Sequence, residues 1–281
     1  MRKNIFKFSL ITISILLGFS CKKSAKSPCG ITDITLFSLD KDRTLGLQVD
    51  SSIKATPAEY TILDSAKYPL VYQELNTIKN NFLNSGKVDH STDFAWKLRV
   101  LKDDSTLNAF CTPGGYIYVY SALIKYLPTL DALAGVMGHE MAHAALRHST
   151  KTMTQQYGLT MLLSIVGGDK SKLAQIVVGL KQLKYSRCHE SEADSYSVEY
   201  LANAKTTSGA SVGYQCDATA RFFEKIEAAG GSRTPEFLST HPSPDNRVAA
   251  IKEKAASIGC NTSTPYDASG SRIQAIVNSL K

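Results

Sequence analysis

The sequence predicts a predominantly helical α+β domain that contains one small β-sheet. Most of the chain after residue 35 places apolar residues at helical spacing. Residues 94–120 instead alternate, or are rich in aromatic and β-branched residues, around Pro113-Gly114-Gly115, a pattern typical of strands joined by a turn. A hydrophobic content of 43% in 281 residues is ordinary for a globular core, so we expect one compact domain.

The first twenty residues differ from the rest of the chain. An apolar run over residues 8–19 follows a basic start and ends just before Cys21. The basic residues are Arg2, Lys3 and Lys7. This arrangement is typical of a secretory signal peptide, and the run is too short for a comfortable membrane span. We interpret residues 1–20 as a signal peptide that is cleaved before Cys21.

Cys21 is the candidate site of lipidation. The segment Leu17-Gly18-Phe19-Ser20-Cys21 resembles the lipobox of bacterial lipoproteins, in which a small residue precedes the cysteine that becomes the lipidated N-terminus. Ordinary signal cleavage nearby is the alternative. With lipidation, residues 21–35 form an anchor cysteine and tether, and the protein is expected on the periplasmic side of the bacterial envelope, anchored to the outer membrane.

The net charge of the chain argues against one class of function, nucleic-acid binding. Removal of residues 1–20 takes away three basic and no acidic residues, so 29 basic minus 25 acidic residues leave a net charge of +4. This small excess does not indicate nucleic-acid binding.

Five cysteines follow Cys21, an odd number, so at least one thiol is expected to be unpaired. A Cys216–Cys260 bridge is one hypothesis, because pairing cannot be read from sequence.

The helices and strands are predicted in order along the chain. Apolar spacing predicts helices over residues 36–53 and 68–83, and the small sheet follows over residues 94–101 and 108–120. Thr129 is a plausible N-cap for a helix that extends to about residue 148. Further helices are expected over residues 153–166, 173–183, 187–204, 217–229 and 246–258. The first two of these helices are expected to be largely buried. Residues 230–245 are predicted to form a loop, and residues 261–281 are predicted to form a C-terminal tail or a short helix.

The helix predicted over residues 129–148 carries a metal-binding motif. His139 and His143 are four residues apart, so both imidazoles project from one helix face and can share one zinc ion at about 2.0–2.1 Å. Glu140 is rotated by roughly 100° from His139, where it can accept a proton from water at the metal. The alternative is chance, since His-Glu-x-x-His is expected in on the order of one random chain in a hundred.

A second acidic segment can complete the site. Catalytic zinc needs a third protein ligand, and Glu190 and Asp194 lie on one face of the next polar helix, with Glu192 turned away. Glu190 is the candidate ligand, while Asp194 is placed to accept the second ring N–H of a ligand histidine. The alternative is that these acidic residues only decorate a solvated helix.

Several segments together resemble the HtpX-like and CaaX-prenyl-protease-like zinc metallopeptidases, metallopeptidase family 48, and among them the soluble exported bacterial branch. The resembling segments are residues 108–110 and 113–117, Gly138 to His143, Glu190 to Asp194, His241-Pro242 and Arg247. The resemblance implies a zincin-type (gluzincin) metallopeptidase domain over residues 36–260, in which the edge strand of the sheet precedes the motif helix. It also implies one Zn²⁺ per chain on His139, His143 and Glu190, with Glu140 as the catalytic base.

The resemblance alone assigns candidate roles at the site to two further residues. His241 either donates to the tetrahedral intermediate or occupies zinc's open position in a resting state. Arg247 either binds a carboxylate near the site or supports its loop through an ion pair. His148 lies five residues after His143 and so leaves the ligand face, which favours a role at the helix end or the surface, and His189 is expected outside the set of ligands.

The expected function is hydrolysis of peptide bonds in extended or misfolded polypeptides, as part of quality control in the cell envelope. An extended substrate is expected to add to an edge strand within residues 108–120. The residues assigned to this binding are Asn108, Ala109, Phe110, Gly114, Gly115 and Tyr116. A purely structural hairpin is the alternative for this segment. A non-catalytic zinc-binding or chaperone-like protein is the alternative for the whole chain, and the sequence does not indicate an oligomeric state.

Overall fold

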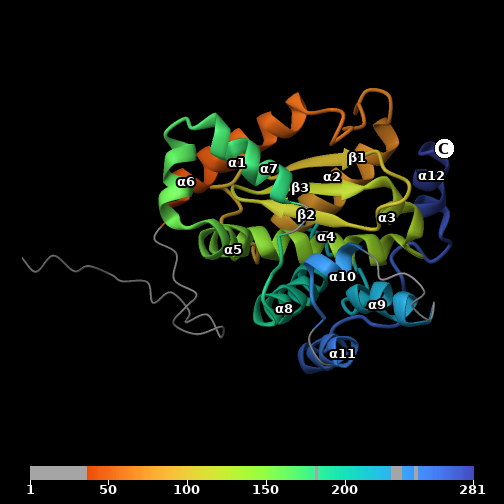
Figure 1. The fold of residues 1–281 in the computed structure, drawn as a ribbon. Coiled ribbons are helices and arrows are strands. Elements are labelled where there is room, and N and C mark those ends of the chain that lie inside the picture. Colours follow the sequence, from red (N-terminus) through yellow and green to blue (C-terminus); the bar gives the residue numbers. More distant parts are fainter. Residues whose placement is uncertain (1–36, 181–182, 229–235, 244–245) are drawn as a thin grey trace, which may run out of the picture.

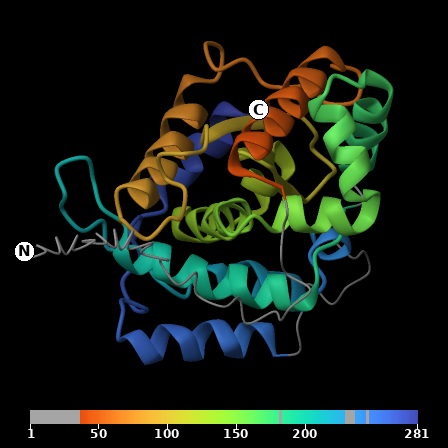
Figure 2. The same ribbon diagram turned by 90° about the vertical axis from the view of Figure 1, so that its left-hand side faces the viewer.

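The computed structural model describes residues 37–180, 183–228, 236–243 and 246–281. The predicted signal peptide, Cys21 and the tether lie outside the described residues. The described residues form a small sheet with helices on both of its faces. A further layer of helices lies below the helix that covers the lower face in Figure 1 (Figures 1 and 2).

Three strands form the sheet, in the order β1-β3-β2. Strand β1 (Lys97–Leu101) pairs parallel with β3 (Tyr116–Tyr120), and β2 (Ala109–Thr112) pairs antiparallel with β3. A turn joins β2 to β3, and its Gly114 and Gly115 have φ of +76° and +82°, a region that favours glycine. The prediction of a small sheet from this part of the chain is confirmed.

The sheet separates two apolar clusters. Along each strand, alternate side chains point to opposite faces. One face carries Ile117 and Val119 and packs against α2 (Pro69–Leu83) and α4 (Leu130–Ala145). The other face carries Tyr118 and Tyr120 and packs with α1 (Leu39–Ala55). The helices predicted over residues 36–53 and 68–83 are thus α1 and α2.

Helix α1 approaches the β2–β3 turn closely because Gly46 has no side chain. A Cβ atom at Gly46 would collide with the carbonyl oxygen of Pro113. The position therefore requires glycine for packing, although a glycine in the interior of a helix costs about 1 kcal/mol relative to alanine.

Three short helices cover the α1 side of the sheet. They are α5 (His148–Tyr157), α6 (Leu159–Val166) and α7 (Lys170–Gly179). The prediction of a helix over 153–166 was wrong in extent, because Gly158, at φ +80°, separates α5 from α6. The expectation that this region is largely buried was also wrong, since α6 buries only Leu162 and Ile165, and Val178 of α7 is 60% exposed.

Helix α4 runs between the sheet and the lower helical layer (Figure 1). Every one of its residues is buried, and the Thr129 side chain caps its N-terminus by accepting a hydrogen bond from the Ala132 N–H at 3.1 Å. The predicted cap is confirmed. A short helix, α3 (Ser121–Tyr126), connects β3 to this segment.

The lower layer contains α8 (Arg187–Asn203), α9 (Ala218–Ala228) and α11 (Arg247–Ile258), and these three helices were predicted from the sequence. Residues 230–245 are not entirely loop, because α10 (Glu236–Thr240) forms within them. Helix α12 (Ser271–Ser279) packs on α2, where Ile273 and Ile276 join the main core. Cys216 and Cys260 form a disulfide, which confirms the hypothesis. Among the described residues, no helix has the length and apolarity needed to cross a membrane.

Buried Asp131 fixes the C-terminal region onto the start of α4. Its Oδ1 accepts hydrogen bonds from the backbone N–H groups of Gln215, at 2.9 Å, and Tyr266, at 3.1 Å. A charged acceptor for two backbone donors connects segments that are far apart in sequence, so its loss leaves both donors without this partner.

Substitution Asp131→Ala is expected to lower the free energy of unfolding by about 3 kcal/mol, because buried donors lose a charged acceptor. Urea denaturation of the purified protein measures this change. Asp89, which is exposed, is the matched control, and Asp89→Ala is expected to change the free energy of unfolding by less than about 0.5 kcal/mol. Equal midpoints for the two variants would contradict the structural role of Asp131.

Candidate metal centre

The residues of the HExxH motif lie deep in the molecule on α4. His139, Glu140 and His143 are each 0% exposed. Helix α8 packs along α4 and supplies Glu190 and Asp194, while α10 ends next to His241. Three elements that are separated in sequence therefore meet at one buried point.

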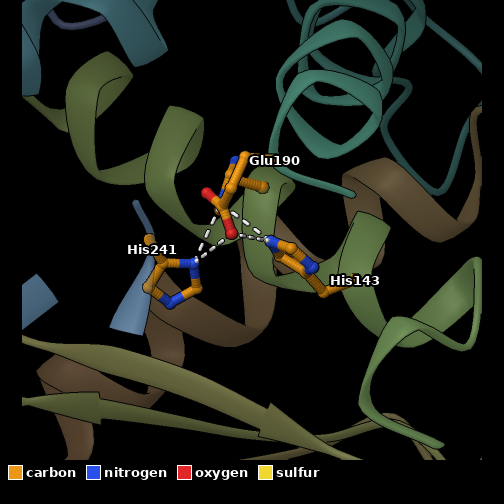
Figure 3. Close-up of side chains that lie close together, drawn as sticks. His143, Glu190 and His241 are labelled. Carbon is orange, nitrogen blue, oxygen red and sulfur yellow. Dashed lines mark hydrogen bonds and ion pairs between the residues drawn. The ribbon is translucent and has the colours of Figure 1, made fainter. Parts of the chain in front are cut away.

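Four potential ligands converge there, namely His139, His143, Glu190 and His241, and one ligand atom from each lies within 4.8 Å of the others. Figure 3 shows His143, Glu190 and His241 pointing toward one another. The Glu190 Oε1 atom lies 3.3 Å from His143 Nε2 and 3.1 Å from His241 Nδ1. The structure thus brings His241 into the same group as the three residues predicted as ligands.

The chemistry of this group fits a divalent metal ion. The Nε2 atoms of His139 and His143 are 3.0 Å apart, and His139 Nε2 is 3.4 Å from His241 Nδ1. Unprotonated ring nitrogens that face one another in a buried space repel, unless a proton or a cation lies between them. Imidazole nitrogens with a carboxylate oxygen are the donor set of many catalytic zinc sites.

Asp194 and Arg247 surround the ligands. The Asp194 Oδ1 atom lies 2.9 Å from His139 Nδ1, the ring nitrogen on the far side from the ligand group. The Nη2 atom of Arg247 donates to Asp194 Oδ1, at 2.8 Å, and to Glu190 Oε2, at 3.0 Å. The Arg247 guanidinium therefore lies on the carboxylates of the site, and its Nη1 also lies 3.5 Å from the His241 carbonyl oxygen.

Charge compensation explains how this cluster stays buried. Burial alone would raise the pKa of Glu190, but His241 and His143 lower it well below its usual range. Burial alone would lower the pKa of His139, but the hydrogen bonds that its ring donates to Asp194 and Glu190 raise it to about 9. Because each carboxylate has a cationic or hydrogen-bonding partner, the buried charges offset one another.

Glu140 lies at the centre but outside the ligand group. Among the described residues, neither of its carboxylate oxygens accepts a hydrogen bond, and the Nε2 atom of His241 lies 3.4 Å from Glu140 Oε1. Burial raises the pKa of Glu140 above its usual value. A buried carboxylate with a raised pKa and free lone pairs can accept a proton during a reaction.

The predicted edge strand needs a correction. Residues 108–120 form a hairpin, because the glycine turn reverses the chain, and Tyr116 belongs to β3, the central strand. Within residues 108–120, the edge strand is β2, with Ala109 and Phe110. This edge is buried here, since the Ser149 hydroxyl donates to the Cys111 carbonyl oxygen at 3.1 Å. Asn108 precedes β2, while Gly114 and Gly115 lie in the turn.

The placement of His148 at the surface was wrong. His148 begins α5, as a helix-end role required, but it is 0% exposed and its Nδ1 lies 3.0 Å from His143 Nδ1. Helix α4 ends before it, and Arg147 adopts a left-handed conformation at φ 61°, so helical spacing from His143 no longer applies. His189 stacks on His148 and is outside the ligand group, as expected.

Tyr185 is a site residue that the sequence analysis missed. Its ring stacks on His143 with centroids 3.9 Å apart, and its hydroxyl lies 3.0 Å from Ser149 Oγ. The residue precedes α8 and belongs to no motif, so the sequence contains no signal that connects it with His143. Its position depends on the backbone of residue 185, whose N–H donates to the Thr240 carbonyl oxygen.

Comparison with known proteins agrees with this geometry. The chain is 28% identical over 204 residues to the beta-barrel assembly-enhancing protease of Escherichia coli (strain K12), which covers 66% of this chain and 40% of that protein. It is 31% identical over 161 residues to the metalloprotease YcaL of the same organism, covering 54% of this chain and 60% of that protein.

A mitochondrial relative is also similar. The metalloendopeptidase OMA1 of Schizosaccharomyces pombe is 30% identical over 172 residues, which cover 59% of this chain and 48% of that protein. The chain thus spans only part of the length of these curated relatives. The family model described as Peptidase family M48 matches residues 69–255, a range that includes α2 and the whole ligand group. The chain therefore belongs to peptidase family M48.

Proposed function

We propose that this protein is a zinc-dependent endopeptidase, with one Zn²⁺ held by His139, His143 and Glu190. The observation that carries the proposal is the convergence of these three ligands beside Glu140, a buried carboxylate that is not itself a ligand. Two histidines and one glutamate are the ligand set of well-known zinc peptidases, which keep a fourth position for water or substrate. The relatives are named as proteases, which supports the same conclusion.

The protein's own residues have distinct roles in this mechanism. Zinc, when bound, would polarise water and the scissile carbonyl. Glu140 accepts the proton of the attacking water and returns it to the leaving amine, so no covalent intermediate is required. Asp194 accepts the Nδ1–H of His139, which would leave the Nε2 lone pair free to bind a metal. Arg247 pairs with both Glu190 and Asp194 and holds the two carboxylates in place.

The position of His241 supports a resting state in which this residue would occupy the fourth position on zinc. Its Nδ1 lies with the three ligand atoms, where zinc's open position would be, and its ring is packed against Phe237 of α10 with centroids 4.1 Å apart. Substrate could then reach the metal only after His241 moves.

Extended or misfolded polypeptides of the cell envelope are the proposed substrates. The β2 edge, with Ala109 and Phe110, lies directly against α4 and would present its backbone to an extended peptide once the segments over it move. A role in envelope quality control and a lipid anchor at Cys21 in the outer membrane belong to this proposal. A non-catalytic zinc-binding or chaperone-like protein is the second candidate, and the retained Glu140 argues against it.

The exchange Glu140→Gln is expected to lower the rate of casein hydrolysis by at least about 10²-fold, because the amide cannot accept the proton. The variant should still bind one zinc per chain, since Glu140 is not a ligand. Glu253, exposed on α11, provides the matched control, and Glu253→Gln should keep wild-type activity. Full activity in Glu140→Gln, or wild-type activity that survives removal of the metal by a chelator, would refute the mechanism.

Replacement of His241 tests the resting state. His241→Ala is expected to raise the rate of casein hydrolysis while the zinc content stays at one per chain, because the substitution opens the fourth position. Rates are compared at equal zinc content, measured on the same samples. If His241 instead acts mainly as a donor to the transition state, the rate will fall by about 10²–10³-fold.

A further inference from the structure

A line of buried side chains leads from His143 away from the ligand group. The His143 Nδ1 atom lies 3.0 Å from His148 Nδ1, and His148 Nε2 lies 3.2 Å from Glu192 Oε2. The three residues are 0%, 0% and 8% exposed. Three helices supply them: α4, α5 and α8.

The proton positions along this line follow from the metal site, so the inference rests on the proposed function. His143 Nε2 faces the ligand group, and a nitrogen that binds a metal carries no proton. Neutral His143 must therefore carry its proton on Nδ1, where it can be donated to His148 Nδ1. His148, as the acceptor, then carries its own proton on Nε2 and donates it to Glu192.

The backbone conformation at the end of α4 brings His148 into contact with His143. The left-handed Arg147 turns the backbone so that His148 faces back toward His143. Arg147 Nε binds Asp42 at 2.5 Å, and Thr150 Oγ1 donates to the same carboxylate at 2.7 Å, so the turn is fixed on both sides. The His148 ring also stacks on His189, with centroids 4.2 Å apart.

We propose that His148 and Glu192 are positioning residues for the metal ligand His143. They form a carboxylate–histidine–histidine relay that fixes the tautomer and the ring orientation of His143. On the other side of the site, Asp194 does the same for His139 through one direct contact of 2.9 Å. Both histidine ligands are thus held by a hydrogen bond to the nitrogen that faces away from the metal, and such partners commonly change metal affinity by 10–100-fold.

Zinc affinity of the full-length protein, measured by competition with a chelator, tests the relay. His148→Leu, which keeps the bulk but removes the acceptor, is expected to weaken zinc binding by about 10–100-fold. His148→Asn places an amide oxygen near the position of Nδ1 and is expected to restore the affinity to within about threefold of wild type. A purely structural role would not produce this rescue.

Glu192 allows a second, independent measurement. Glu192→Leu is expected to weaken zinc binding by a smaller factor than His148→Leu, and the double variant should be no weaker than His148→Leu alone, because both changes break one relay. The visible spectrum of the Co²⁺-loaded variants should shift as the ring of His143 reorients. The melting temperature of each metal-free variant identifies any that fail to fold, in which case Glu192→Leu and His148→Asn carry the test.

The outcomes separate the relay from the proposed function. If folded His148→Leu binds zinc as tightly as wild type, or if the two changes add independently, the relay is refuted while the metal site stands. If the wild-type protein itself binds no zinc, the proposed function fails first. A selective loss of affinity that Asn restores supports the relay.

Discussion

Burial of the Glu190 carboxylate is the constraint on which the rest of the site depends. An ionised carboxylate that is 0% exposed is costly unless it is paired and hydrogen-bonded. Arg247 and the histidines around it supply that compensation, and they come from α4, α11 and the segment after α10. Because a metal would add positive charge at the same point, one arrangement of helices serves both the charge balance and the proposed chemistry.

The position of α4 follows from this arrangement. Its small residues allow close contact on all sides, and Gly135 leaves room where a Cβ would lie only 2.6 Å from the backbone nitrogen of Thr219 on α9. The sheet on one side and α8 on the other then exclude water from the motif. In such surroundings the electrostatic effects of Asp194 and Arg247 are stronger than they would be at a surface.

The same close packing gives the site its closed character. His241 lies with the ligand atoms, and α10 holds it there through Phe237, while Ser149 satisfies a carbonyl on the edge strand. Under the proposed function, such contacts would have to break before a peptide adds to β2.

The sequence by itself determined the helices with regular apolar spacing and the pairs at fixed helical distance, His139 with His143 and Glu190 with Asp194. These follow from the geometry of one helix, which a short segment already specifies. Only the tertiary structure decided which face of the sheet each helix covers, and where His148 and Tyr185 lie. The position of His148 depends on a left-handed residue that ends α4, and that of Tyr185 on contacts with distant segments. The helical periodicity of the sequence specifies neither of these two positions, because each results from interactions between elements that meet only in the folded chain.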